Sequence, residues 1–241
     1  MRTLNNALCF CLAVGALLTG LPTHAEMGMG PAKALTYVSV DRLEAQFRDG
    51  DDARIWDAEA WIGGDIHKAW FKTQGEDVSD EGLERAELQA LYSRAIAPFW
   101  DLQLGLRHDL RPNPSKTYAV VALEGLAPYR IDVEASGFMS EDGDASVRLE
   151  LDYDLRLTQQ WILRPRAEID FAFSQVSDLQ VGKGPTTLET GLRLHYAIKP
   201  EFAPYIGVDF ESALSSTRGL KKDAGEQRSS WGAVIGLSGW F

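Results

Sequence analysis

The sequence predicts an all-β fold, a transmembrane antiparallel β-barrel of about 12 strands that follows a cleaved signal peptide. Three observations support this prediction. Segments of roughly 10 to 13 residues alternate strictly between apolar and polar side chains, as strands with one apolar face do. These segments exceed the usual five or six residues of soluble strands and match a tilted strand that crosses a membrane. The connections between them alternate between short and long.

The first 25 residues have the features of a signal peptide. Arg2 precedes an apolar run over residues 7–21, and Thr23-His24-Ala25 places small residues at the expected cleavage point. The apolar run is shorter than the about 20 residues of a membrane-spanning helix, which is the alternative. We therefore expect a signal peptide at 1–25, a short periplasmic segment at 26–35 and the barrel at 36–241.

Cysteine is confined to the expected signal peptide, at Cys9 and Cys11. The mature chain therefore has no thiol for a disulfide, for catalysis or for metal binding. Methionine is then its only soft metal ligand.

Period-two alternation is clearest between residues 147 and 157, where odd positions are apolar and even positions are mostly charged. Segments 163–173 and 188–198 repeat the pattern. The expected strands are 36–47, 53–63, 65–75, 84–96, 99–110, 117–126, 129–139, 146–157, 160–174, 187–198, 201–211 and 229–241. Their number is even, as in single-chain bacterial barrels.

The connections favour a barrel of the bacterial outer membrane. Short turns at 63–64, 97–98, 127–128, 158–159 and 199–200 alternate with longer polar joints at 75–83, 111–116, 140–145, 175–186 and 212–228. In this class the short turns face the periplasm, and closure leaves no open sheet edge in hydrocarbon. The last strand carries apolar residues on alternate positions up to Phe241, which resembles the C-terminal recognition signal of outer-membrane proteins. A soluble β-sandwich is the alternative, although its strands rarely run this long.

Aromatic residues lie near the ends of the expected strands, where girdles at the membrane interfaces would place them. This set comprises Trp61, Phe99, Trp100, Tyr129, Trp161, Phe202, Tyr205 and Trp240.

The charge of the chain argues against nucleic acid as a partner. Lys and Arg number 24 against 35 Asp and Glu, a formal net charge of −11, which cleavage after Ala25 would make one unit more negative. Binding to nucleic acid depends on Lys and Arg contacts with phosphates, so cations are the more suitable partners.

Both signs of charge occupy the positions that alternation turns inward. The acidic positions are Asp57, Glu59, Glu87, Asp101, Asp109, Asp132, Glu134, Glu150, Asp152, Asp154, Glu168, Asp170, Glu189 and Asp209. The basic positions are Lys68, Lys72, Arg85, Arg107, Arg130, Arg148, Arg156, Arg164, Arg166 and Arg193. In a barrel smaller than the large porins, such mixed charges favour a lumen that is plugged or lined for cations over an open pore.

Specific runs of residues resemble a known family. They are Trp61-Ile62-Gly63-Gly64-Asp65, Lys68-Ala69-Trp70-Phe71-Lys72-Thr73, Gly75-Glu76 and the continuous run from Ala86 to Gln103, which includes Tyr92-Ser93-Arg94 and Trp100-Asp101. From Tyr37 to Phe241 the chain is similar to the copper resistance protein B (CopB) family. The resemblance implies an outer-membrane barrel that binds or exports periplasmic copper, without catalytic residues, together with periplasmic multicopper oxidases or copper carriers as partners.

The chain departs from this family near its N-terminus. Many members carry a long Met- and His-rich stretch after the signal peptide, which here shrinks to Met27-Gly28-Met29. Sequestration of many ions by such an arm is therefore not expected. A copper role would depend instead on the barrel or on its partners.

The candidate copper ligands are His195, Met27, Met29, His108 and His67. His195 has inward parity and could join the lumen carboxylates, or it could be a hydrogen-bonded filler. His108 and His67 have outward parity near the strand ends and are expected at the membrane interfaces. Met139 has outward parity at a strand end, where it would pack against lipid.

Two other functions stay open at this stage. A general cation-permeable or structural barrel fits the composition equally well. A lipid-hydrolysing barrel would need a serine beside His108 or His67 on the outer wall, and the sequence shows no evident candidate.

Overall fold

The computed structural model describes residues 34–79, 82–176, 180–224 and 227–241. The expected signal peptide at 1–25, and Met27 and Met29 with it, lie outside the described residues. No helix among the described residues is long and apolar enough to cross a membrane.

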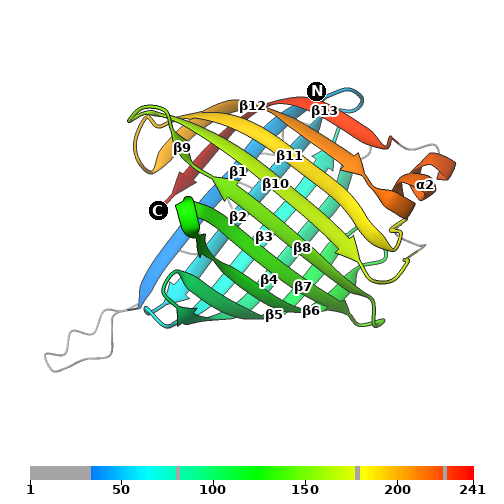
Figure 1. Cartoon of the computed structure of the whole chain (residues 1–241), viewed down its shortest axis with the longest axis horizontal. Coiled ribbons are helices and arrows are strands. Elements are labelled where there is room, and N and C mark those ends of the chain that lie inside the picture. Colours follow the sequence, from blue (N-terminus) through cyan, green and yellow to red (C-terminus); the bar gives the residue numbers. More distant parts are fainter. Residues whose placement is uncertain (1–33, 80–81, 177–179, 225–226) are drawn as a thin grey trace, which may run out of the picture. The chain divides into compact units, whose positions relative to one another are not determined.

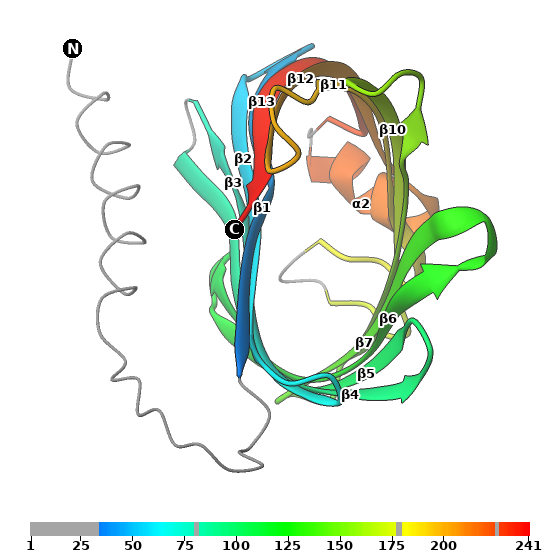
Figure 2. The same ribbon diagram turned by 90° about the vertical axis from the view of Figure 1, so that its left-hand side faces the viewer.

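The described chain forms one closed antiparallel β-barrel (Figures 1 and 2). Its elements are β1 (Leu35–Arg48), β2 (Ala53–Gly63), β3 (His67–Val78), β4 (Gly82–Ala97), β5 (Trp100–Arg111), β6 (Lys116–Ala127), η2 (Pro128–Arg130), β7 (Ile131–Ser140), β8 (Ala145–Tyr153), β9 (Leu155–Arg156), β10 (Trp161–Ala172), β11 (Gly184–Tyr196), β12 (Phe202–Ala213), α2 (Ser215–Ala224) and β13 (Ser229–Trp240). Strands β8 and β9 share one place beside β10, so the wall has 12 strands, as predicted.

The barrel closes through pairing of its first and last strands. β1 pairs with β13 from Ser39–Trp240 to Arg48–Gly232, and the pairing of β10 with β11 completes the ring. At the C-terminus the Phe241 amide donates to the Val38 carbonyl at 2.8 Å, and the Val38 amide donates back at 3.0 Å. The terminal residue therefore completes the seam that the sequence pattern predicted.

The surface polarity is inverted relative to that of a soluble protein. On β5, Leu104 and Leu106 are 49% and 58% exposed on the outer face of the strand. Gln103, on the opposite face of the same strand, is completely buried. Similar exposed apolar residues occur along the other strands. Because an exposed apolar belt of this size is unfavourable in water, the outer wall is suited to lipid and the polar face lines the lumen.

The two ends of the barrel differ. The start of β1 and the C-terminus lie at the end that carries the short turns, which we call the short-turn end, and the long connections lie at the opposite, long-loop end (Figure 1). The expected loop at 212–228 instead contains helix α2, which contacts β11 and β12. Period-two alternation predicts strands only, so it gave no indication of this short polar helix.

Two expected girdle residues were assigned to the wrong face. Tyr205 is 2% exposed and its hydroxyl donates to Glu44 at 3.0 Å, inside the lumen. Trp61 packs against buried Trp70, also on the lumen side. Position near a strand end does not decide facing, because strict alternation continues to the end of the strand.

Candidate functional site: an acidic cavity in the barrel lumen

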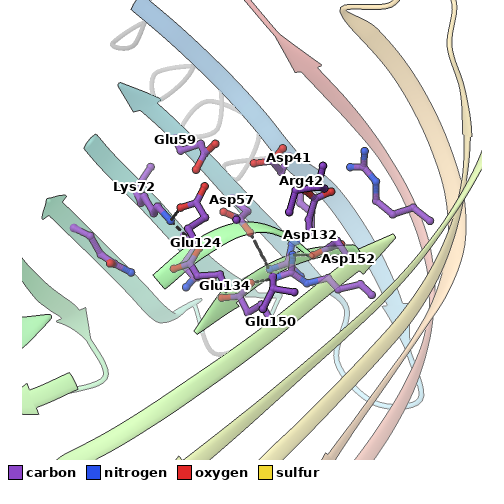
Figure 3. A pocket seen from close by; sticks show the side chains of 18 of the residues that line it. Asp41, Arg42, Asp57, Glu59, Lys72, Glu124, Asp132, Glu134, Glu150 and Asp152 are labelled. Carbon is purple, nitrogen blue, oxygen red and sulfur yellow. Dashed lines mark hydrogen bonds and ion pairs between the residues drawn. The ribbon is translucent and has the colours of Figure 1, made fainter. Parts of the chain in front are cut away.

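A cavity of about 420 Å³ lies inside the barrel toward the short-turn end (Figure 3). Nine carboxylates and five basic side chains line it, so its lining is acidic overall. The acidic residues are Asp41, Asp57, Glu59, Glu87, Glu124, Asp132, Glu134, Glu150 and Asp152, and the basic ones are Arg42, Lys72, Arg164, Arg166 and Arg193. Tyr37, Leu126 and Val133 place it near the start of β1, the end of β6 and the start of β7.

Lys72 organises one wall of the cavity. Its Nζ lies 2.8 Å from Glu124 Oε2 and 2.7 Å from Glu134 Oε2, which come from β6 and β7 (Figure 3). Glu59 extends from β2 beside this group. Two carboxylates thus share one ammonium, and the surplus negative charge faces the cavity.

The opposite wall is built around Arg166 of β10. Its guanidinium pairs with Glu150, with Asp152 at 3.2 Å and with Glu168 at 3.2 Å. Asp57 of β2 lies 3.9 Å from the same guanidinium and 3.2 Å from Arg42, so this cluster connects strands from distant parts of the ring.

A chain of buried ion pairs crosses the lumen along the long-loop side of the cavity, and two of its members, Glu87 and Arg166, also line the cavity. We call it the ion-pair belt, and it comprises Arg107, Glu87, Arg148, Glu168 and Arg166. Arg107 lies 2.8 Å from Glu87, Arg148 lies 3.4 Å from Glu87 and 3.3 Å from Glu168, and Arg166 completes the chain. Arg107 and Arg148 also lie over the ring of Phe138, at 4.7 and 5.6 Å from its centroid. The lumen therefore contains the interlocking ion pairs that mixed inward charges predicted.

Two further ion pairs cross the lumen at about the same height. Arg85 of β4 reaches Glu189 of β11 at 3.6 Å, and Arg193 of β11 reaches Glu44 of β1 at 2.9 Å. Beyond them, a second cavity of about 500 Å³ at the long-loop end is lined partly by Arg48, Glu76 and Lys221. The described lumen thus contains two polar cavities, the acidic cavity and this second one, which we call the long-loop compartment.

Among the predicted ligands that the structure describes, His195 alone lines the acidic cavity. It lies on β11 with inward parity, as predicted, and is 3% exposed. Its Nδ1 lies 3.2 Å from Ser238 Oγ, and its Nε2 is buried without a hydrogen-bond partner among the described residues.

The other candidate residues that the structure describes do not converge on His195. His67 is exposed and its Nδ1 lies 2.5 Å from the Tyr92 hydroxyl, while His108 is exposed and its Nδ1 lies 3.0 Å from Thr117 Oγ1. Met139 is 49% exposed on the outer wall. In the part of the chain that the structure describes, no group of three or more His, Cys, Asp or Glu is arranged to hold a metal ion.

The sequence reasoning missed part of the cavity lining. Asp41 and Arg42 are neighbours in the chain, yet both line the cavity, because a β-bulge between Val40 and Leu43 shifts the parity of β1. Two adjacent charges within an alternating strand are the signal that could have revealed it. Conversely, Arg130 and Arg156 were expected to point inward but are exposed, in η2 and β9 near the short-turn end.

Comparison with known proteins agrees with this architecture. The family model for copper resistance protein B precursor (CopB) matches residues 34–241. The chain is 40% identical over 209 residues to copper resistance protein B of Escherichia coli, covering 86% of this chain and 70% of that protein. It is 38% identical over 206 residues to the copper resistance protein B homolog of Pseudomonas syringae pv. tomato (strain ATCC BAA-871 / DC3000), with the same coverage of each.

Solved structures share the fold. The NanC porin superposes with a TM-score of 0.56 at 14% identity, covering 84% of this chain and 98% of the porin. The outer membrane phospholipase A from Escherichia coli superposes with a TM-score of 0.50 at 12% identity, covering 85% and 92%. At these identities the likeness concerns the fold alone.

The inverted surface, the closed barrel and these relatives place the protein in the bacterial outer membrane. The name of the family refers to copper resistance and to no enzymatic activity. The match to the family model and the two similar proteins agree with the resemblance seen in the sequence. The chain belongs to the copper resistance protein B (CopB) family, and this membership supports a role in copper resistance.

Proposed function

We propose that this barrel contributes to copper resistance by taking periplasmic copper ions into its acidic lumen cavity. The observation that carries the proposal is the excess of carboxylates over basic side chains around the cavity, at the end of the barrel that holds the short turns. Short turns face the periplasm in this class of barrel, so the cavity would face the compartment where the copper is.

The cavity suits a hydrated cation. A volume of about 420 Å³ is large compared with the ≈ 30 Å³ that one water occupies in the liquid. A copper ion could therefore enter with part of its water shell. Carboxylates on low-dielectric walls also focus the field and raise the local concentration of cations.

Closure above the cavity favours binding over free export. The ion-pair belt lies between the acidic cavity and the long-loop compartment, so an ion would pass outward only if these pairs rearranged. Exchange with a periplasmic multicopper oxidase or copper carrier would occur at the short-turn end. Met27 and Met29 would supply thioether ligands for copper.

The role of the negative charge of the cavity in copper binding can be tested without leaving a basic side chain unpaired. Glu59, Asp132 and Asp41 line the cavity but take part in none of the ion pairs found between described residues. The triple variant Glu59→Gln, Asp132→Asn, Asp41→Asn is expected to bind copper on the order of tenfold more weakly, because the local field that concentrates cations falls. It should also restore less copper tolerance to a strain that lacks the gene.

The matched control neutralises three exposed carboxylates, in Asp65→Asn, Glu141→Gln and Asp223→Asn. Copper titration of the purified barrels and growth in copper are the two measurements. Wild-type tolerance and affinity in the cavity triple variant would reject the cavity as the copper site. Unchanged tolerance in the deletion strain itself would reject the copper role as a whole.

A further inference from the structure

We infer that the outer wall of the barrel binds an anionic phospholipid, of the phosphatidylglycerol type, in an apolar groove near the short-turn end. The inference concerns the contact between the barrel and its membrane and does not depend on copper binding. The groove has a volume of about 450 Å³, and its lining comprises Tyr129, Ile131, Leu151, Asp152, Tyr153, Pro165, Arg166 and Ala167. These residues come from η2, β7, β8 and β10, and β8 lies between β7 and β10 in the wall.

Strand pairing explains why the groove is apolar. Leu151 of β8 faces Ala167 of β10, and Tyr153 shares their outward parity. Asp152 and Arg166, of the opposite parity, also border the groove. Their charged groups pair at 3.2 Å, and both residues line the acidic cavity inside the barrel. The groove therefore opens on the lipid-facing side and offers aliphatic and aromatic side chains to an acyl chain.

Two residues of β10 keep the groove open. Ala167 has only a methyl side chain, and Pro165 lacks the N–H group that a strand donates to its neighbour. Pairing of β10 with the adjacent strand accordingly stops after Arg166, where β8 ends, and resumes only at Leu163, where β9 begins. The wall is thus hollowed where long side chains and regular pairing are both absent.

The turn beside the groove has an unfavourable backbone conformation. Tyr129 and Arg130 both have positive φ, 68° and 65°, a region that residues other than glycine seldom adopt. Tyr129 is 87% exposed and lines the groove. Strained residues of this kind cluster at sites that hold ligands. Here the strain presents an aromatic and a basic residue in succession at the short-turn end of the groove.

Arg130 supplies the charge that selects the headgroup. It is exposed and takes part in none of the ion pairs found between described residues. Because short turns face the periplasm in this class of barrel, Arg130 would lie among the phospholipid headgroups of the periplasmic leaflet. Long basic side chains at a membrane interface extend to the headgroups and attract anionic lipids. A second copy of this chain fits less well, since a two-fold contact would bring like-charged Arg130 side chains into one interface.

The headgroup is tested by native mass spectrometry of the full mature barrel, purified in mild detergent and mixed with phosphatidylglycerol or phosphatidylethanolamine. We expect the wild type to retain a single lipid, with a preference for phosphatidylglycerol. Arg130→Gln should lower the retention of phosphatidylglycerol about fivefold and leave that of phosphatidylethanolamine unchanged. Arg94→Gln is the matched control, because Arg94 is also exposed near the short-turn end, but on β4 in a different part of the ring.

The groove is tested by filling it. Ala167→Phe is expected to lower the retention of both lipids at least about fivefold, because the ring would occupy the space of an acyl chain and expel its buried methylene groups. Ala90→Phe, at an exposed position of β4, should retain both lipids as the wild type does. Heat-dependent gel mobility would show that each variant is folded.

Tyr129→Gly separates lipid binding from stability, and it tests the site independently if Ala167→Phe does not fold. Glycine adopts positive φ without strain, so this variant should unfold at no lower urea concentration than the wild type. It should nevertheless retain less lipid, because one wall of the groove is lost.

Three results would overturn the inference. Equal retention of phosphatidylglycerol by Arg130→Gln and Arg94→Gln would reject the assigned headgroup. Equal lipid retention by Ala167→Phe and Ala90→Phe, or by Tyr129→Gly and the wild type, would reject the groove as the site. A wild-type barrel that forms a lipid-free dimer would show that a second copy covers this face instead.

Discussion

Replacing Arg148 with methionine is expected to destabilise the folded barrel by about 3–5 kcal/mol. Arg148 is 5% exposed and pairs with Glu87, Glu168 and Asp170 at 3.4, 3.3 and 3.1 Å. Methionine keeps an unbranched side chain but is shorter and carries no charge, so the three carboxylates would lose a shared cation in a poorly hydrated position. Removing one partner of a buried ion pair is costly because the other charge stays buried.

The measurement is urea unfolding of the barrel in lipid vesicles, followed by tryptophan fluorescence. Arg54→Met is the matched control, because the side chain of Arg54 is 61% exposed and its pair with Asp77 is 3.4 Å long. An exposed pair of this kind contributes about 0–1 kcal/mol. If the two variants unfolded at the same urea concentration, the ion-pair belt would have no special role in stability.

The wild-type barrel is expected to show no steady conductance in planar bilayers, and the double variant Arg148→Ala, Arg166→Ala is expected to conduct cations. Both arginines join opposite parts of the lumen wall, and both are largely buried. Alanine removes their bulk along with their charge. Water could then connect the two compartments through a passage whose remaining charges are mostly carboxylates, which would favour cations.

Reversal potentials in a salt gradient would measure the cation preference of the double variant. Arg54→Ala, at the exposed pair near the long-loop end, should stay silent as the wild type does. Steady, copper-independent conductance of the wild type would contradict closure by the belt. It would favour the alternative of a general cation-permeable barrel.

Much of the wall could be predicted because period-two alternation is a local property. The bounds of β2, Ala53–Gly63, agree with the expected strand at 53–63, since turns and polar joints interrupt the alternation at both ends. The inward position of His195 follows from the same rule. The rule fails at the bulge in β1, where one extra residue brings both Asp41 and Arg42 to the lumen.

The sequence by itself determined that this chain forms a barrel with an apolar outer wall and a charged lumen, because facing depends only on neighbours along the strand. The tertiary structure decided which charges meet. Arg85 and Glu189 come from opposite walls, and so do Arg166 and Asp57, because barrel diameter and strand stagger set these distances. The two polar cavities of the lumen, and the ion pairs beside them, follow from closure of the barrel.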